Sequence, residues 1–374
     1  MTATSPLPSV AHTVADVEAR RGGPSRSIPA LCAAVAEAGV PTTLVTWLED
    51  DATLPGVPVH RAGRGLRAYS RAVREAAARH DLVHDHGLWR LSNLATGRAA
   101  ASAGRPLVVS PRGMLEPQAL RRRSWKKRAA WVGYQRALLR SAAALHATSE
   151  SEAEGIREAG VRCPIAVIPN GVQAPDDLPP RSRGDTRHAL FLSRLHPIKG
   201  LPLLIEAWAD VRPDGWTLLV AGPDDGGHRA EVERLVAEAG LTEVVRFLGP
   251  VDDDDKWALY RSADLFVLPT QTENFGLVIA EALAAAVPVL TTTGAPWPVL
   301  REEALGWWEA PRPRPFAAAL RDATSRTPED LAGRGERGRA YVRQSLGWDA
   351  IGARMAAVYR WLVFGGERPA DVVL

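Results

Sequence analysis

The sequence predicts an α/β protein with two doubly wound parallel sheets in tandem. Short apolar runs alternate with amphipathic stretches of helical length, which is the pattern of parallel strands joined by crossover helices. At 374 residues and 40.3 kDa, the chain exceeds the size at which one hydrophobic core usually stops growing. The alternation stops near residues 173–186 and then begins again, so we expect two domains.

Each predicted strand is a short apolar run bounded by turn residues. In the first half these runs are 10–14, 42–46, 81–84, 107–110, 144–147 and 165–168, and in the second half 189–192, 218–221, 244–248, 265–268 and 289–292. Between residues 27 and 39, Ile28, Leu31, Cys32 and Val35 recur at spacings of three and four, which predicts a helix that covers a sheet face.

The predicted linker, 173–186, has no apolar periodicity and contains APDDLPPRSRGD. We therefore expect an N-terminal Rossmann-like domain over residues 1–175 and a second such domain over 186–347. A final helix should begin at Trp348, with Ile351, Met355, Val358 and Tyr359 on one side. The tail, GERPADVVL, has no pattern and is expected to be loose.

Composition and charge exclude several classes of protein. The net charge of +3 and the pI of about 9.1 are too mild to indicate a nucleic-acid partner, which needs a concentrated basic face. Cys32 and Cys163 fit neither a disulfide framework nor a metal site. The amino terminus resembles no export signal, and no run of 18 apolar residues occurs. We expect a cytoplasmic protein.

The carboxyl ends of parallel strands are where such sheets bind ligands, so the loops that follow the strands are the candidates for a site. In TQTENFGLVIAEALAAAVPVL, Glu281 is the sole charge between Leu277 and Ala286, and burying an unpaired carboxylate costs several kcal/mol. A ribose diol could satisfy it, and the first amides of the helix could bind phosphate or sugar oxygens. Glu273, just before the helix, would face a hexose. The alternative is that Glu281 bonds to a neighbouring loop and Glu273 is merely exposed.

Three more loops contain candidate groups. Arg194 and Lys199 lie in FLSRLHPIKGLPLL, where two cations could stabilise a departing diphosphate in place of a metal, unless the loop is simply a solvated basic turn. His84 and His86 share one side of a strand end, and could contact substrate or form a structural pair; without a third ligand at suitable spacing, metal is not expected. Gly22 and Gly23 would let backbone approach a ligand, or form an ordinary turn.

The run from Asp252 to Asp255 could be mistaken for a metal-binding Asp-x-Asp pair. It precedes Lys256, Trp257, Leu259 and Tyr260 in helical spacing, and acidic residues favour a helix start. We interpret the run as the beginning of a helix.

The loops and their order resemble those of the family 4 retaining glycosyltransferases of the GT-B fold, in which two Rossmann-like domains face each other across a cleft. The resemblance spans nearly the whole chain. It rests on Glu273 and Glu281 with seven residues between them, on Arg194 with Lys199, on IPNGV at 168–172 and on Gly22-Gly23. SPRGMLEPQAL from Ser110, TTTGAPW from Thr291 and GWWE from Gly306 resemble, more narrowly, members that build bacterial polysaccharides.

The resemblance implies transfer of a hexose-type sugar from a nucleoside diphosphate sugar to an acceptor hydroxyl, with retention and without metal or cofactor. The acceptor would be a lipid-linked or polysaccharide glycan, or a small natural product. The implied catalytic residues are Glu273, His86, Arg194 and Lys199. The implied donor-binding residues add Gly22, Gly23, Leu248, Val251, Asn274, Phe275, Gly276, Leu277 and Glu281. The acceptor would meet Trp89, Arg112 and Glu116, and the final helix would cross back to the first domain.

One dense basic segment lies in the expected acceptor domain. It consists of Arg121, Arg122, Arg123, Lys126, Lys127 and Arg128, interleaved with Trp125 and Trp131. Anionic lipid headgroups are a suitable partner, which would place the protein peripherally at the inner membrane surface. A solvated helix face, or binding of an acidic acceptor, is the alternative.

Two other functions are compatible with the same fold. A nucleotide-sugar epimerase would bind the same donor but would need acid and base carboxylates around the sugar. A noncatalytic partner of a transferase complex would retain the fold alone. The presence of Glu273, Glu281, Arg194 and Lys199 favours an active transferase.

Overall fold

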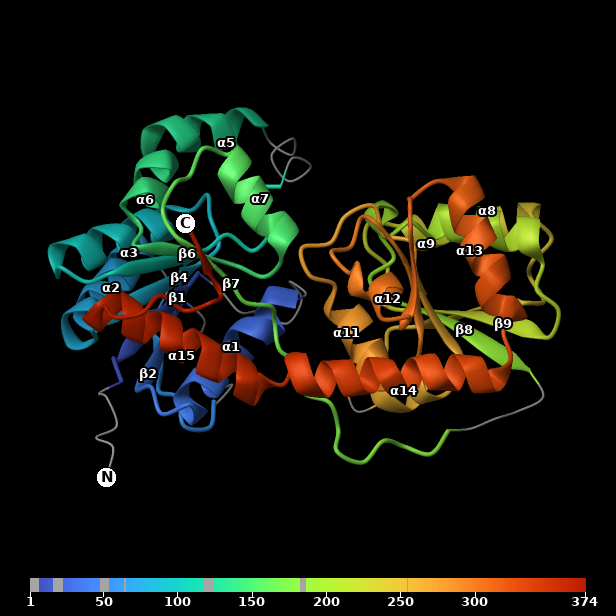
Figure 1. The fold of residues 1–374 in the computed structure, drawn as a ribbon. Helices are drawn as coiled ribbons and strands as arrows, with labels where there is room; N and C mark the ends of the chain where they lie inside the picture. The colour runs from blue at the N-terminus through green and yellow to red at the C-terminus, as the bar shows by residue number, and fades with distance from the viewer. Residues whose placement is uncertain are drawn as a thin grey trace, which may run out of the picture. The chain divides into compact units, whose positions relative to one another are not determined.

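The computed structural model of the protein describes residues 7–15, 23–47, 54–63, 65–116, 124–181, 186–253 and 255–374. The chain divides into two compact units, Met1–Gly171 with Trp348–Leu374 (unit 1) and Val172–Gly347 (unit 2). Each unit holds a parallel sheet with helices on its faces (Figure 1), which confirms the predicted fold class. The division falls at Val172, next to the predicted linker at 173–186.

The sheet of unit 1 has the order β14-β7-β6-β5-β4-β1-β2-β3. All its strand pairs are parallel except β14 with β7, which is antiparallel. The strands are β1 (Val10–Val14), β2 (Thr42–Thr46), β3 (Val59–Arg61), β4 (Leu82–His86), β5 (Leu107–Ser110), β6 (Ala144–Ala147), β7 (Ile165–Val167) and β14 (Val372–Val373).

Strand alternation divides the core of unit 1 into two layers. Val10, Leu82 and Val108 pack with the helices α1 (Gly23–Glu37) and α15 (Trp348–Phe364). The next residues along the same strands face α2 (Leu66–Arg79) and α3 (Leu91–Ser102). The remaining helices are α5 (Ser124–Ala130), the π-helix η2 (Trp131–Gln135), α6 (Arg136–Ser141) and α7 (Glu150–Glu158).

Unit 2 has an all-parallel sheet in the order β10-β9-β8-β11-β12-β13. Its strands are β8 (Arg187–Leu192), β9 (Trp216–Ala221), β10 (Val245–Gly249), β11 (Leu265–Leu268), β12 (Val289–Thr292) and β13 (Gly306–Glu309). Its helices are η3 (Pro197–Lys199), α8 (Leu201–Val211), α9 (His228–Glu238), α10 (Lys256–Arg261), α11 (Leu277–Ala284), α12 (Val299–Glu302), α13 (Pro313–Ser325) and α14 (Pro328–Ser345).

The prediction that the tail is loose is wrong. Val372 and Val373 form β14 against the edge strand β7, and Arg354 binds the Asp371 carboxylate through Nη2 at 2.6 Å and Nε at 3.1 Å. A two-residue edge strand and one ion pair leave no periodic pattern, which is why the sequence did not predict them. The edge strands β3 and β13 were not predicted either, because each is only partly buried and so departs from the fully buried apolar run of a central strand.

Cys32 and Cys163 are both free thiols, and burial raises the pKa of each. Within the described residues, no helix has both the length and the apolar character needed to cross a bilayer.

Candidate functional site

In unit 2, three loops converge at the carboxyl edge of the sheet. The loop after β11 is tied to the loop after β8 by the bond from Gln271 N to Ile198 O at 2.8 Å. It is tied to the loop after β12 by the bond from Glu273 N to Gly294 O at 2.7 Å. These backbone bonds fix the position of Glu273 relative to both neighbouring loops.

Lys199 and Glu273 form an ion pair in this loop cluster. Both side chains are 13% exposed, so the pair is largely removed from water. Gly200 allows the Lys199 loop to approach the backbone of Pro269. Its φ is 77°, and a Cβ there would lie 1.9 Å from the Pro269 carbonyl oxygen. Only glycine fits a left-handed position with backbone so close, so the loop of Lys199 lies directly against the end of β11.

Helix α11 begins beside this ion pair. Gly276, at φ 81°, is its N-cap, and Ile279 N donates to the Gly276 carbonyl at 2.9 Å, so Leu277 and Val278 supply the amides that a helix start leaves without an intrahelical partner. The Trp297 indole N–H donates to the Phe275 carbonyl at 2.5 Å, and the two rings pack at 5.4 Å. Trp297 therefore holds the turn that orients these amides.

Glu281 has partners within the protein. Lys256 Nζ donates to Oε1 at 3.0 Å and Tyr260 OH donates to Oε2 at 3.0 Å, while the side chain remains 13% exposed. Glu281 therefore has the partners that the sequence predicted it would need, but they lie on helix α10 and not on a neighbouring loop, and Glu273 is 13% exposed and so is largely buried. Each oxygen has a second lone pair, so the carboxylate can still accept bonds from a ligand.

Arg194 and Lys199 are each paired with a carboxylate. Arg194 Nη1 lies 2.5 Å from Asp225 Oδ2, in a pair with side-chain exposures of 49% and 39%. An ion pair this exposed adds little stability, so a ligand could displace Asp225 at small cost. Of the implied donor-binding residues in and after β10, Leu248 is 46% exposed and Val251 is partly buried.

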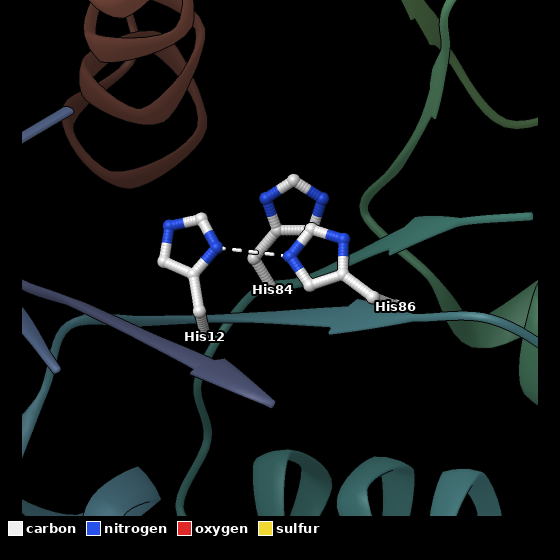
Figure 2. A group of neighbouring side chains, drawn as sticks. All are labelled: His12, His84 and His86. Carbon is white, nitrogen blue, oxygen red and sulfur yellow. Dashed lines mark hydrogen bonds between the residues drawn. The ribbon is translucent and has the colours of Figure 1, made fainter. Parts of the chain in front are cut away.

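In unit 1, the prediction that His84 and His86 share a side of the strand is confirmed, since their ring centroids are 4.2 Å apart. A third histidine, His12 on β1, lies beside them (Figure 2), and its Nδ1 is 3.0 Å from His86 Nε2. The expectation that no third nitrogen is available is therefore wrong, because β1 and β4 are adjacent strands.

Arg112 follows β5 and is 8% exposed. Its Nη1 donates to Asn170 Oδ1 at 2.8 Å and approaches Ser27 Oγ at 3.4 Å, and its Nη2 is 3.3 Å from His86 Nδ1. Its φ of 56° is in the left-handed region, which is costly for a side chain of this size. Burial lowers the pKa of Arg112, and the nearby Glu152 opposes that shift.

The buried histidines are neutral at pH 7. Burial, assisted by the Arg112 charge, lowers the pKa of His12 and of His146 to about 3. Burial also lowers the pKa of His84 and His86 well below 6.5. On the opposite face of β4, burial raises the pKa of Asp85 to about 7 against bonds from Asn93 and Thr13.

His12, His84 and His86 offer nitrogens that lie within 4.8 Å of one another, which is the spacing of a metal site. Each of these rings, however, already forms hydrogen bonds through both nitrogens. The Arg112 cation also contacts His86, which disfavours a second cation nearby. The expectation that the protein needs no metal remains a prediction.

The other predicted residues lie as follows. Gly22 and Arg121, Arg122 and Arg123 fall outside the described residues, and Gly23 is the first residue of α1. Trp89, at φ 73°, donates its backbone N–H to Gln135 Oε1 at 2.9 Å, and Glu116 is partly buried after β5. Trp125, Lys126, Lys127 and Arg128 lie on α5.

The interpretation of the acidic run as a helix start is confirmed. Helix α10 begins at Lys256, with Asp255 as its N-cap and a bond from Lys256 N to Asp252 O at 3.1 Å. Lys256 and Tyr260, four residues apart on one face, were missed as partners of Glu281. Their helical spacing in the sequence was the available signal.

Comparison with known proteins identifies the family. The model for "Glycosyl transferases group 1" matches residues 177–339, and the model for "Glycosyl transferase 4-like domain" matches residues 22–171. A D-inositol 3-phosphate glycosyltransferase of Streptomyces scabiei is 31% identical over 324 residues, covering 79% of this chain and 72% of that protein. The lipopolysaccharide core mannosyltransferase LpsB of Rhizobium meliloti is 34% identical over 177 residues, 43% of this chain and 48% of that protein.

Solved structures share the fold. Sucrose-phosphate synthase from Thermosynechococcus elongatus has a TM-score of 0.80 at 22% identity, covering 95% of this chain and 98% of its own. Anabaena HepE, solved with UDP and glucose, has a TM-score of 0.72 at 20% identity, covering 93% and 98%. The chain therefore belongs to the group 1, family 4-like glycosyltransferases of the GT-B fold, and is an enzyme that transfers sugar.

Proposed function

We propose that this enzyme transfers a hexose-type sugar from a nucleoside diphosphate sugar to an acceptor hydroxyl, with retention and without a metal ion. One observation carries the proposal. Glu273 precedes α11 and Glu281 lies one turn inside it, and these two largely buried carboxylates are each paired with a lysine. Amide donors between two fixed carboxylates suit a ligand that combines phosphates with two sugars.

Each part of the donor has a group of matching chemistry. The amides at the start of α11 would donate to phosphate or sugar oxygens, and the open lone pairs of Glu281 would accept bonds from the ribose diol. Glu273, held by Lys199, would bind hydroxyls of the transferred sugar. Backbone from Leu248 to Val251 would meet the base.

The charges of Lys199 and Arg194 would stabilise the leaving group. As the bond from the sugar C1 to the phosphate oxygen breaks, negative charge grows on the diphosphate, and one cation about 4 Å away contributes roughly 4 kcal/mol at an effective dielectric of about 20. The acceptor oxygen forms its bond to C1 on the same face, and its proton passes to the departing phosphate oxygen. No protein nucleophile is required.

The named relatives support this choice of substrates. HepE is described with UDP and glucose, and another solved neighbour, a trehalose-6-phosphate protein of E. coli, with UDP-2-fluoro glucose. The relatives that cover most of the chain are named for an inositol phosphate acceptor. A nucleoside diphosphate sugar and a polyhydroxyl acceptor fit both descriptions.

Donor binding is tested by calorimetric titration with UDP, GDP, ADP and dTDP and with their sugars. We expect one nucleoside diphosphate to bind wild type, and Glu281→Ala to weaken it at least tenfold. Glu336→Gln, a substitution of an exposed glutamate on α14, is the matched control and should bind as wild type does. Equal binding to wild type and Glu281→Ala would overturn the donor site.

Retention and metal independence are tested on the product. With an α-linked donor, proton NMR should show an α-linked product, and turnover should persist in excess EDTA. A β-linked product, or activity that EDTA abolishes and a divalent cation restores, contradicts the proposed mechanism.

We also propose peripheral contact with anionic lipid through α5. Trp125 is 70% exposed and Val132, on the adjoining η2, is 85% exposed, beside Lys126, Lys127 and Arg128. Exposed aromatic and aliphatic groups next to cations suit a headgroup surface. Sedimentation with anionic vesicles should carry wild type down and leave Trp125→Ser behind, while neutral vesicles bind neither. Equal and negligible binding to both vesicles would refute the contact.

A further inference from the structure

The buried histidines of unit 1 belong to one hydrogen-bonded chain that the proposed reaction does not use. His12 comes from β1, His84 and His86 from β4 and His146 from β6, and each is at most 3% exposed. Two hydroxyl groups, Ser110 at the end of β5 and Tyr359 on α15, link the imidazoles. The chain thus crosses the face of the sheet that α1 and α15 cover.

The two ends of this chain fix its direction. A guanidinium can only donate and a carbonyl oxygen can only accept. At one end, Arg112 Nη2 donates to His86 Nδ1 at 3.3 Å, so His86 carries its proton on Nε2 and donates to His12 Nδ1 at 3.0 Å. His12 must then donate from Nε2 to the Tyr359 hydroxyl oxygen at 3.3 Å.

The same direction continues to the far end. Tyr359 donates its hydroxyl proton to His84 Nδ1 at 2.6 Å, and His84 Nε2–H donates to Ser110 Oγ at 2.7 Å. Ser110 donates to His146 Nδ1 at 2.9 Å, and His146 Nε2–H donates to the Ile168 carbonyl at 2.8 Å. All four histidines are therefore neutral Nε2–H tautomers, and each hydroxyl donates once and accepts once.

This chain determines the surroundings of Arg112. Its hydrogen-bond acceptors, the side chains of His86, Asn170 and Ser27, are all neutral, and no carboxylate bonds to it among the described residues. The lone-pair end of the imidazole chain points at the guanidinium, which stabilises the cation through dipoles. Because Arg112 bonds to no carboxylate among the described residues, a ligand can pair with its charge without first displacing one.

The position of Arg112 agrees with a binding role. It follows β5, while Asn170 follows β7 and His86 ends β4, so three strand ends meet at the carboxyl edge where open parallel sheets bind ligands. Its Nε is buried without a hydrogen-bond partner among the described groups, and its backbone is held at a φ of 56°. An unpaired donor and a strained backbone on one buried cation indicate a functional group.

We propose that Arg112 binds an anionic group of a substrate, a phosphate or carboxylate, and that the histidine chain from His86 to His146 positions it. His86 is then a positioning residue, since both of its ring nitrogens are engaged, and not the catalytic residue that the sequence resemblance implied. The inference rests on the proposed function, because the anion belongs either to the acceptor or to the donor diphosphate.

The tautomers provide a direct test in the full-length protein. Two-bond proton–nitrogen NMR of protein labelled with ¹⁵N-histidine, assigned with single His→Gln variants, should show four neutral imidazoles with unprotonated Nδ1. Equimolar Zn²⁺ should leave these signals unchanged. An Nδ1–H tautomer at His12, His84 or His86 would show that the hydrogen bonds do not run in this direction. A shift of all three signals on adding Zn²⁺ would show that the cluster is a metal site. Either result would overturn the proposal.

The anion site is tested by steady-state kinetics and by calorimetry. Arg112→Gln should raise one KM by 10-fold to 100-fold while the histidine signals at His12, His84 and His146 stay near their wild-type positions, and Arg112→Lys should recover part of the loss. If the Kd of the nucleoside diphosphate rises equally, the anion is the donor diphosphate. If only the acceptor KM rises, the anion belongs to the acceptor. Unchanged KM values for both substrates would overturn the site.

The positioning role is tested at His86. His86→Asn, which can still offer an oxygen to Arg112, should retain more affinity than His86→Leu, which cannot. Equal KM values for the two variants contradict positioning through this bond. Because Glu281 lies in unit 2, loss of donor binding in Glu281→Ala reports on the proposed function separately from any effect at Arg112.

Discussion

At the scale of single residues, the donor site depends on lysines that balance buried glutamates. Glu281 is accompanied by Lys256, and Glu273 by Lys199, so each carboxylate is neutralised where water is largely absent. Leaving one buried partner alone is far more costly than exchanging both. The apolar sequence around Glu281 predicts that it needs partners, but only the packing of α10 on α11 identifies them.

We expect Lys256→Met to impair donor binding without unfolding unit 2. The substitution leaves Glu281 with Tyr260 alone, so its carboxylate becomes less stable and moves toward water, and KM for the donor should rise about 10-fold, or 1.4 kcal/mol. Initial rates over a range of donor concentrations give the value. Arg234→Met, which removes a highly exposed ion pair with Glu238, serves as control and should change neither KM nor kcat. A wild-type KM in Lys256→Met would contradict the coupling.

The buried histidines also predict acid sensitivity. A histidine whose folded pKa lies below its unfolded value of 6.5 binds fewer protons when folded, so its stabilisation is present above pH 6.5 and is lost as the pH falls. Asp85, with a pKa raised to about 7, acts in the opposite direction and retains its proton when folded. The effect of the four histidines His12, His84, His86 and His146 is therefore larger than the opposite effect of Asp85.

Unfolding of unit 1 between pH 6 and pH 5 should take up about three protons net. The free energy of unfolding should therefore fall by about 4 kcal/mol as the pH falls by one unit. Urea denaturation followed by circular dichroism at several pH values measures this slope. His146→Gln should make the slope shallower by about one proton. A stability that is level from pH 6.5 to pH 5 would mean that these imidazoles are not neutral in the folded protein.

At the scale of helices, α1 and α15 pack together because a glycine removes the side chain between them. A Cβ on Gly352 of α15 would lie 2.2 Å from the Ala34 carbonyl oxygen of α1. The same two helices cover the histidine chain, and α15 supplies Tyr359 to it. The distance between these helices therefore also sets the geometry around Arg112.

Gly352→Ala should destabilise unit 1 by about 2 kcal/mol, because the added methyl group pushes α15 away from α1. Gly155 lies in the interior of α7, with nothing within 4 Å of a Cβ there and no unusual φ. Gly155→Ala is thus a matched control, expected to stabilise by about 0.5–1 kcal/mol through helix propensity. Urea titration of both variants checks the opposite signs, and equal effects would contradict the close approach.

At the scale of the whole molecule, the sequence predicts what is local and periodic. Strands such as β1, β2, β5, β11 and β12 were predicted to the residue, because buried parallel strands are short apolar runs between loops. The resemblance identified the family, and the loops after the strands gave Glu273 and Lys199. The histidine chain could not be predicted from the sequence. It depends on which strands lie next to β4 and on Tyr359, which is 275 residues from its partner His84 in the polypeptide.

The division into units predicts the effect of truncation. Removal of residues 348–374 deletes α15, β14 and Tyr359 from unit 1 and leaves the whole of unit 2. We expect the truncated chain to bind its nucleoside diphosphate within about 10-fold of wild type, while hydrogen exchange across β1, β4 and β5 becomes fast. Calorimetry and exchange mass spectrometry measure the two effects. Slow exchange in those strands would show that unit 1 folds without its last segment.

Unit 1 is made from both ends of the chain, with unit 2 encoded between them, and this determines an order of events on the ribosome. The first part of unit 1 emerges early, but the surface of its sheet beneath α15 stays uncovered until residues 348–364 are synthesised. All of unit 2 is synthesised before α15, so unit 2 can fold while unit 1 is still incomplete. We therefore expect unit 2 of the nascent chain to fold before unit 1 is completed. Until then, the apolar face of the sheet in unit 1 should need protection from aggregation.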